Sequence, residues 1–159
     1  MKGIVFDFGG VITQPQDKEL FSFLEARLGW TYEMVRAGWK KHRRLMDADL
    51  ISIEELYLRM AEDLQQPLSH ELAVEIGRID YDSWAHPNVE TITWMETLAQ
   101  EGYRIGILTN MPSNYLPWYN RSAATAREIA FAEVISGFEH LAKPQPEIYQ
   151  LMAERMQLT

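Results

Sequence analysis

Three short apolar segments, each leading into polar or small residues, set the fold class of this chain. Residues 3–6 run into Asp7, residues 103–110 end in Thr109-Asn110, and residues 132–136 precede a loop that contains Lys143. Short and nearly continuous apolar segments are typical of strands that are buried on both faces of a sheet. Because helical patterns separate these strands, we predict an α/β fold with a parallel sheet and right-handed crossovers.

The longest interval between two of these segments has a helical period. Its apolar residues recur every three to four positions, and Gly29 is a typical helix stop. Further helix starts are predicted at Thr31, at Ser52, which forms a capping box with Glu55, and at Ser69. We therefore expect residues 15–87 to form a helical cap inserted after the first strand. The α/β core would then consist of residues 1–14 and 88–159.

The rest of the chain alternates between helical and strand patterns. Asn88 is placed to cap a helix that ends near Gly102. Residues 123–130 are compatible with a helix, residues 147–156 are predicted to form the last one, and the stretch between Asn110 and residue 123 is expected to be irregular.

Composition excludes several classes of protein. The chain has 15 Lys and Arg against 23 Asp and Glu, and the resulting net charge of −8 disfavours nucleic acid as a partner. The absence of cysteine excludes disulfide scaffolds and thiol nucleophiles. No segment is long and apolar enough for a signal-peptide core or a bilayer span, so we expect no membrane association and a cytoplasmic location.

The polar residues at the strand ends suggest a chemistry. The carboxyl ends of parallel strands meet at one edge of a sheet, which would bring Asp7, Thr109 and Lys143 together. A carboxylate can attack phosphorus, while a hydroxyl and an ammonium can bind the phosphoryl oxygens. The pair Gly9-Gly10 lets the backbone approach an anion closely. The combination predicts a phosphoryl-transfer site.

Residues 6–12 (FDFGGVI), 107–110 (ILTN) and 141–149 (LAKPQPEIY), taken in this order, resemble the first three motifs of the haloacid dehalogenase-like (HAD) superfamily. A helical cap between the first and second strands is also typical of this superfamily. The resemblance implies a HAD-like Rossmannoid sheet. It also implies hydrolysis of a small phosphorylated metabolite through an aspartyl phosphate, with Mg²⁺ as cofactor.

The resemblance to the small-molecule phosphatases of the superfamily implies a role for each motif residue. Asp7 would be the nucleophile and a metal ligand, and the backbone carbonyl of Gly9 would be a second metal ligand. Lys143 would be a catalytic residue that pairs with both the nucleophile and the phosphate. The substrate-binding residues would be Thr109, Asn110 and Gly10.

The sequence departs from the family pattern at two places. Gly9 stands where most phosphatases of the superfamily have an aspartate, which protonates the leaving oxygen. General acid catalysis of this kind contributes about 10²–10⁴ in rate. The segment after Lys143 is too short for a further helix, a strand and the acidic fourth motif. We therefore expect a truncated HAD sheet, weakened or lost Mg²⁺ binding, and self-association through the open edge of the first strand.

Two alternative functions stay open on the sequence. One is a 2-haloacid dehalogenase, in which Asp7 attacks carbon and no metal is needed. The other is a non-catalytic remnant that acts by self-association or by binding a partner through the edge of the first strand.

Several further residues have weaker signals. The basic run at 40–44 is interpreted as a solvated helix face, with an anion-attracting face toward the cleft as the alternative. The four histidines lack metal-ligand spacing and are assigned no catalytic role. Trp118 and Tyr119 are the aromatic residues expected to line a substrate pocket. The acids considered, and disfavoured, as replacement metal ligands are Asp47, Asp49, Asp80 and Asp82.

Overall fold

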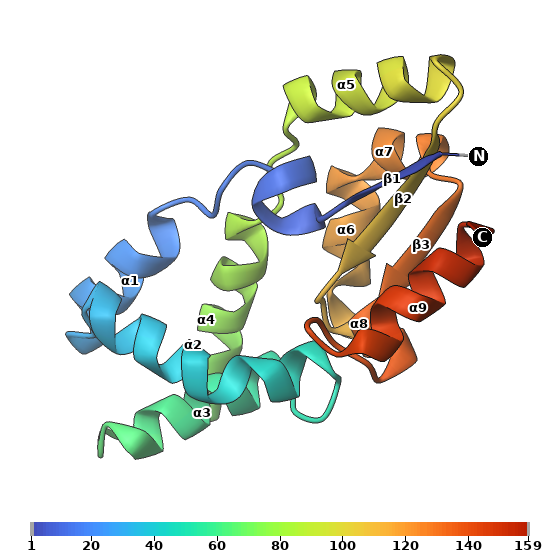
Figure 1. Cartoon of the computed structure of the whole chain (residues 1–159). Helices are drawn as coiled ribbons and strands as arrows, with labels where there is room; N and C mark the ends of the chain where they lie inside the picture. Colours follow the sequence, from blue (N-terminus) through green and yellow to red (C-terminus); the bar gives the residue numbers. More distant parts are fainter. Residues whose placement is uncertain (1, 159) are drawn as a thin grey trace.

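The fold is built on a parallel three-stranded sheet (Figure 1). A computed structural model describes residues 2–158. The strands are β1 (Gly3–Phe6), β2 (Arg104–Thr109) and β3 (Ala132–Ile135), in the order β1-β2-β3. Gly106 of the central strand pairs with Val5 on one side and with Ala132 on the other. The predicted α/β class and its three strands are confirmed.

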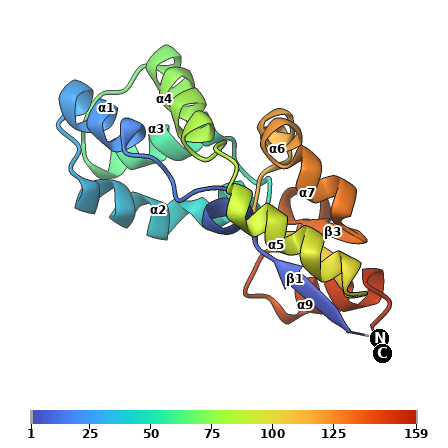
Figure 2. The same ribbon diagram turned by 90° about the horizontal axis from the view of Figure 1, so that it is seen from above.

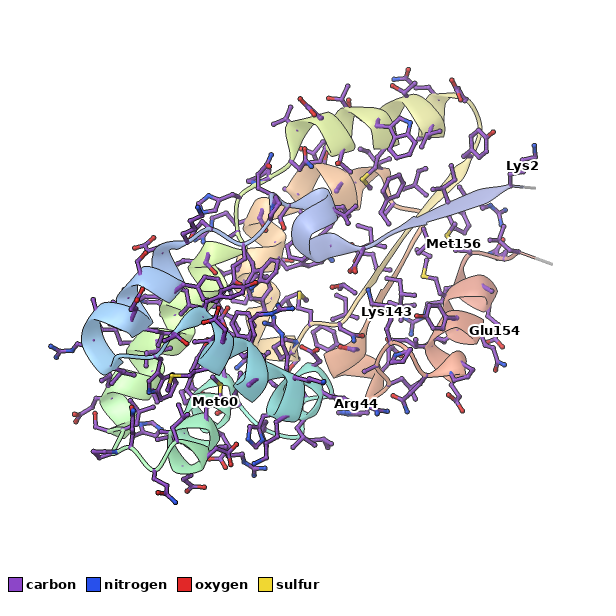
Figure 3. The ribbon with its side chains drawn as sticks, turned by 60° about the vertical axis from the view of Figure 1, so that its left-hand side comes forward. Lys2, Arg44, Met60, Lys143, Glu154 and Met156 are labelled. Atoms are coloured by element: carbon purple, nitrogen blue, oxygen red, sulfur yellow. The ribbon has the colours of Figure 1, made fainter. Side chains whose placement is uncertain are left out.

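Helices cover both faces of this sheet. On β2, Ile105 and Ile107 belong to the larger apolar core, which includes residues of α5 (Val89–Gln100). Leu108 belongs to a smaller core with α9 (Pro146–Arg155), which lies on the opposite face (Figure 2). Met156, at the end of α9, lies beside the sheet, whereas Met60 lies far from it in the helical part of the molecule (Figure 3).

Four helices connect β1 to the second half of the molecule. The starts of the last three are capped as the sequence predicts: the side chains of Thr31, Ser52 and Ser69 each accept a backbone N–H from the first turn. Gly29 ends the first of them with a φ of 69°. We call these helices the helical block: α1 (Glu19–Leu28), α2 (Tyr32–Asp47), α3 (Ile53–Asp63) and α4 (His70–Ser83). No helix within residues 2–158 has the length and apolar character that a bilayer crossing requires.

The two segments that join the helical block to the sheet lie side by side. The N–H of Gln14 donates to the carbonyl of His86 at 2.7 Å, and the N–H of Asn88 donates to the carbonyl of Ile12 at 2.8 Å. The entry and exit of the block thus form one antiparallel junction. The domain boundaries at this junction, residues 14/15 and 87/88, stay a prediction.

The segment expected to be irregular contains helices, so that expectation was wrong. A single 3₁₀ turn at Ser113–Tyr115 leads into α6 (Leu116–Ser122), and α7 (Ala124–Ile129) follows directly. No side chain caps the start of α6, which removes the usual sequence signal. The short helix α8 (Ser136–Glu139) after β3 was also not predicted.

Among the described residues, 2–158, strand β1 forms one edge of the sheet. It pairs with β2 on one side only, and Val5 is 42% exposed. Its outer backbone groups are therefore available for pairing with another chain.

Candidate active site

Asp7 and Lys143 form an ion pair at the carboxyl edge of the sheet. Asp7 follows β1, and its Oδ1 accepts the N–H of Phe8 at 2.8 Å, which fixes the carboxylate at the start of the turn formed by Phe8–Ile12. Lys143 Nζ lies 2.7 Å from Asp7 Oδ2 and donates to the carbonyl of Leu108 at 3.2 Å. The Asp7 side chain is still 45% exposed, so it is accessible to a ligand.

Asn110 holds the loop that carries Lys143. Its Nδ2 donates to the Lys143 carbonyl at 3.0 Å, and its Oδ1 accepts the Lys143 N–H at 2.7 Å. The sequence predicted only a phosphate-binding role for Asn110. The amide side chain also satisfies both backbone groups of Lys143, which lies 33 residues later in the chain, and the phosphate-binding role stays a prediction.

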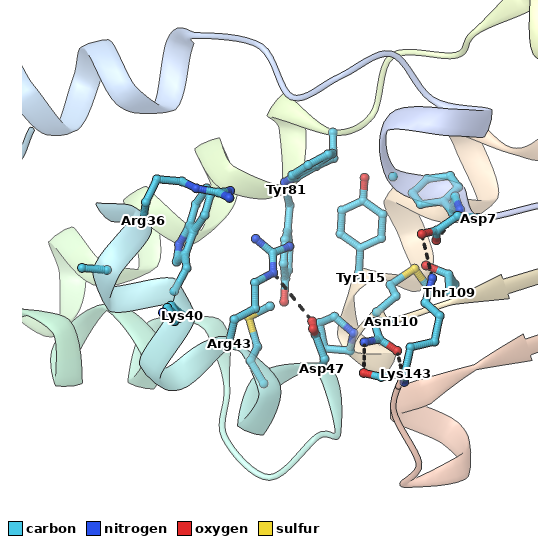
Figure 4. A pocket seen from close by; sticks show the side chains of 18 residues that line it. Asp7, Arg36, Lys40, Arg43, Asp47, Tyr81, Thr109, Asn110, Tyr115 and Lys143 are labelled. Carbon is cyan, nitrogen blue, oxygen red and sulfur yellow. Dashed lines mark hydrogen bonds and ion pairs between the residues drawn. The ribbon is translucent and has the colours of Figure 1, made fainter. Parts of the chain in front are cut away.

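All the predicted site residues except Gly10 line one cleft of about 750 Å³ (Figure 4). Asp7, Gly9, Thr109, Asn110 and Lys143 form its sheet side, as the strand topology requires. Thr109 is buried at the end of β2. The structure thus brings these residues together, and their chemical roles stay predictions.

Gly10 is not among the residues that line this cleft. Its N–H donates to Thr13 Oγ1 at 3.2 Å, and its φ is 77°, a conformation that favours glycine. In this structure Gly10 shapes the turn after β1 instead of facing the cleft, so its predicted contact with substrate has no structural support.

The basic run at residues 40–44 divides between two sides of α2. Lys40 and Arg43 line the cleft. Lys41 and His42 instead contact Asp63 of α3, with nitrogen-to-oxygen distances of 2.5 and 2.7 Å. The run therefore has one part at the cleft and another against α3, and attraction of an anion by the cleft part stays a prediction.

Further cleft residues were missed by the sequence analysis. Arg36 lies four residues before Lys40 on α2 and shares its face. Helical spacing relates these two cations, but nothing in the sequence shows which face of α2 meets the sheet. The aromatic cleft residues that were not predicted are Phe8, Trp39, Tyr81, Trp84 and Tyr115.

The aromatic residues expected in the pocket lie outside it. Tyr119 is fully buried and its hydroxyl donates to Glu133 at 2.9 Å. Trp118 Nε1 donates to Asp82 Oδ1 at 2.7 Å, which ties α6 to the end of α4. The expectation was wrong by about one helical turn, because Tyr115, not Trp118 or Tyr119, lines the cleft.

Two buried acids of the helical block are perturbed. Asp80 accepts hydrogen bonds from Tyr57, Gln16 and Trp84, and burial raises its pKa. Asp47 lines the cleft, and burial raises its pKa to about 6 even though Arg43 Nε lies 3.8 Å from its Oδ1.

The donor set for a metal is small. Within residues 2–158, no three or more His, Cys, Asp or Glu side chains cluster in a way that could hold a metal ion. The acids considered as replacement ligands therefore form no cluster of this size with Asp7 in the described residues. Mg²⁺ can, however, be bound by one or two carboxylates together with waters and substrate phosphate. Asp7 and Gly9 both line the cleft, and their predicted role as ligands in a site of that shared kind stays a prediction.

The comparison with family models covers the whole chain. The sequence matches the family described as haloacid dehalogenase-like hydrolase over residues 1–159. The chain belongs to this family. It is therefore a HAD-like hydrolase, and the suspected resemblance is confirmed. A comparison with curated proteins gave no significant match.

Solved structures of HAD enzymes share this fold. The HAD family enzyme BT-2542 from Bacteroides thetaiotaomicron has a TM-score of 0.67 and 17% identity, with 100% of this chain and 80% of that chain covered. Its wild-type complex with magnesium and inorganic phosphate has a TM-score of 0.64 and 18% identity, and covers 97% of this chain and 78% of that one. At these identities the likeness establishes the fold alone.

Proposed function

We propose that this HAD-like hydrolase cleaves small phosphomonoesters through an aspartyl phosphate on Asp7. The observation that carries the proposal is the convergence of Asp7, Thr109 and Lys143 on one cleft, with Lys143 Nζ 2.7 Å from the Asp7 carboxylate. A nucleophile, a hydroxyl and an ammonium are then within reach of one tetrahedral anion.

The first half of the reaction forms the intermediate. A carboxylate oxygen of Asp7 attacks phosphorus, and the bond between phosphorus and the ester oxygen breaks. The Lys143 ammonium, the Thr109 hydroxyl and the backbone N–H of Asn110 would balance the charge on the phosphoryl oxygens. Asn110 acts also through its side chain, because its two hydrogen bonds to the Lys143 backbone keep the loop in place.

The second half of the reaction restores the enzyme. Water attacks the phosphorus of the aspartyl phosphate, inorganic phosphate leaves, and the Asp7 carboxylate is regenerated. Asp7 is held in the same orientation throughout by the Phe8 N–H.

A magnesium ion would be held by Asp7 and the Gly9 carbonyl, together with water and the substrate phosphate. When bound, it would neutralise phosphate charge. The complex of BT-2542 with magnesium and inorganic phosphate supports this proposal for a protein of the same fold.

The helical block is proposed to act as the cap that selects the substrate. Arg36 and Lys40 line the cleft opposite Asp7, and neither has an ion-pair partner among the described residues. Tyr81 and Trp84 supply an aromatic wall. Unpaired cations beside aromatic rings suit a small anionic metabolite.

The decisive test is release of phosphate from p-nitrophenyl phosphate with and without Mg²⁺. We expect Mg²⁺-dependent turnover that Asp7→Asn abolishes. Asp63→Asn, which changes an acid on the far side of α2, should leave turnover unchanged.

Other outcomes favour the alternative functions. Metal-independent halide release from 2-chloropropionate, without phosphate release, would contradict the proposal and identify a dehalogenase in which Asp7 attacks carbon. Inactivity in both assays, combined with a stable oligomer, would favour the partner-binding alternative.

A further inference from the structure

The proposed reaction needs a proton for the leaving oxygen, and Gly9 cannot supply it. An alkoxide is a poor leaving group, and general acid catalysis of its departure contributes about 10²–10⁴ in rate. Gly9 lines the cleft beside the nucleophile without any acidic side chain. Another group in the cleft must therefore act as the acid if ordinary alkyl phosphates are substrates.

Asp47 is the one carboxyl group, besides Asp7, among the described residues that line the cleft. The two cleft tyrosines, Tyr81 and Tyr115, are poor candidates, because burial raises the pKa of each phenol further from neutrality. The cleft arginines and lysines are strong bases that give up protons reluctantly.

The backbone of Asp47 is fixed to the sheet side of the molecule. Ser136 Oγ donates to the Asp47 carbonyl and accepts the N–H of Met111 at 2.8 Å. Two residues later, Asp49 Oδ1 accepts the N–H of Ser113 at 2.8 Å. These contacts hold the end of α2 against the loops that follow β2 and β3. Figure 4 shows Asp47 between Arg43 and the residues of the sheet edge.

The Asp47 carboxyl lies in an environment that favours its neutral form. The residue is only 8% exposed, and its Oδ1 is buried with no hydrogen-bond partner in the part of the chain that the structure describes. A buried carboxylate oxygen without a donor is costly, whereas a protonated carboxyl is not.

Four charged groups act on this carboxyl. Arg43 on α2 and Lys143 on the sheet side favour its ionised form, whereas Asp80 on α4 and Asp7 oppose it. Burial is the largest effect, and the net result is a pKa of about 6. A pKa close to neutrality suits a group that must both give and recover a proton.

From this geometry we propose that Asp47 is the general acid of the reaction, in place of the acid missing at Gly9. The inference rests on the proposed phosphatase function. As Asp7 attacks phosphorus and the ester P–O bond breaks, the neutral Asp47 carboxyl transfers its proton to the leaving oxygen and becomes a carboxylate. In the second half, that carboxylate takes a proton from the attacking water. The cycle ends with an alcohol, inorganic phosphate and a protonated Asp47.

The test compares two esters that differ in their need for this proton. p-Nitrophenolate leaves as a stable anion, whereas the alkoxide of glycerol 2-phosphate does not. We expect Asp47→Asn to lower kcat/KM for glycerol 2-phosphate on the order of 10²-fold or more, and to change that for p-nitrophenyl phosphate by less than about threefold. Asp63→Asn, a cap acid outside the cleft, is the matched control and should change neither.

The pH profile of the unmodified enzyme gives an independent readout that does not depend on the variant. For glycerol 2-phosphate, kcat/KM should fall about tenfold per pH unit above pH 6. The ratio of kcat/KM for glycerol 2-phosphate to kcat/KM for p-nitrophenyl phosphate should follow the same curve. A ratio independent of pH between 5 and 8 would overturn the inference.

The outcomes separate the inference from the function on which it rests. Equal losses for both esters in Asp47→Asn would show a structural or binding role, and unchanged activity would show no role, so either result overturns the inference. If the unmodified enzyme hydrolyses neither ester, the proposed function itself is refuted, and the inference with it.

Discussion

Replacing Asp47 by asparagine is expected to stabilise the protein above pH 6, although it removes the proposed acid. Burial raises the pKa of this carboxyl from 3.8 to about 6. The folded state therefore binds more protons than the unfolded state between about pH 4 and pH 6. As pH rises through this window, Asp47 ionises and the free energy of unfolding falls. Above the window the folded protein has the full cost of a buried charge.

The magnitude follows from the size of the shift. About two pKa units at about 1.4 kcal/mol each give about 3 kcal/mol as the upper limit of the cost above pH 6. For a chain of this length, 1 kcal/mol corresponds to about 2–4 °C in Tm. The variant should thus melt up to about 10 °C higher than the wild type at pH 8, and the two should converge near pH 4.

Differential scanning calorimetry at several pH values checks this expectation. Asp63→Asn is a control for which the change in stability should have the opposite sign. Hydrogen bonds from Lys41 and His42 lower the pKa of Asp63, so its ionised form stabilises the fold at neutral pH. That variant should lose stability at neutral pH and approach the wild type in acid. A Tm for Asp47→Asn that lies below the wild-type value at pH 8 would refute the reasoning about Asp47.

Three other changes have defined outcomes. Asn110→Ala removes two hydrogen bonds to the Lys143 backbone, at about 1 kcal/mol each, so Tm should fall by about 4–8 °C and kcat should drop. The control Asn120→Ala changes an exposed asparagine and should not affect kcat. An unaltered kcat in Asn110→Ala would show that the loop keeps its conformation without the Asn110 side chain. Gly106→Ala adds a methyl that would overlap the ends of the Met152 and Met156 side chains, which are flexible and can shift. Denaturation in guanidinium should therefore show a loss of no more than about 1 kcal/mol, and a loss of several kcal/mol would contradict this reasoning. Sedimentation velocity should detect self-association through the β1 edge, and Val5→Lys should weaken it, because Val5 is exposed on this strand. A wild-type protein that stays monomeric at high concentration would contradict this prediction.

Local signals explain which elements were predictable. The helices capped by Thr31, Ser52 and Ser69 start where the sequence predicts, because a cap uses a side chain and an N–H only three residues apart. Helix α6 has no such cap, and it begins at Leu116 beside a proline that is equally compatible with a loop. Its helical form depends on packing of residues such as Tyr119, which no local pattern records.

The candidate site was predictable where topology alone brings residues together. Asp7 and Thr109 end adjacent parallel strands, so their proximity follows from the strand order. The contacts of Asn110 and Asp47 were not predictable, since they depend on how a loop and a helix end pack against distant parts of the chain. An amphipathic pattern likewise identifies a polar face on α2 without showing that Arg36 faces the cleft.

The paired segments that join the helical block to the sheet have an evolutionary consequence. Because Ile12 and Gln14 are hydrogen-bonded to Asn88 and His86, the chain leaves the part that contains the sheet and returns to it at nearly the same point. A short turn would be enough to bridge that point if the intervening segment were excised. A different helical segment inserted at this point would leave the carboxyl ends of the strands in place, so the proposed substrate preference could change without any change at the proposed catalytic residues.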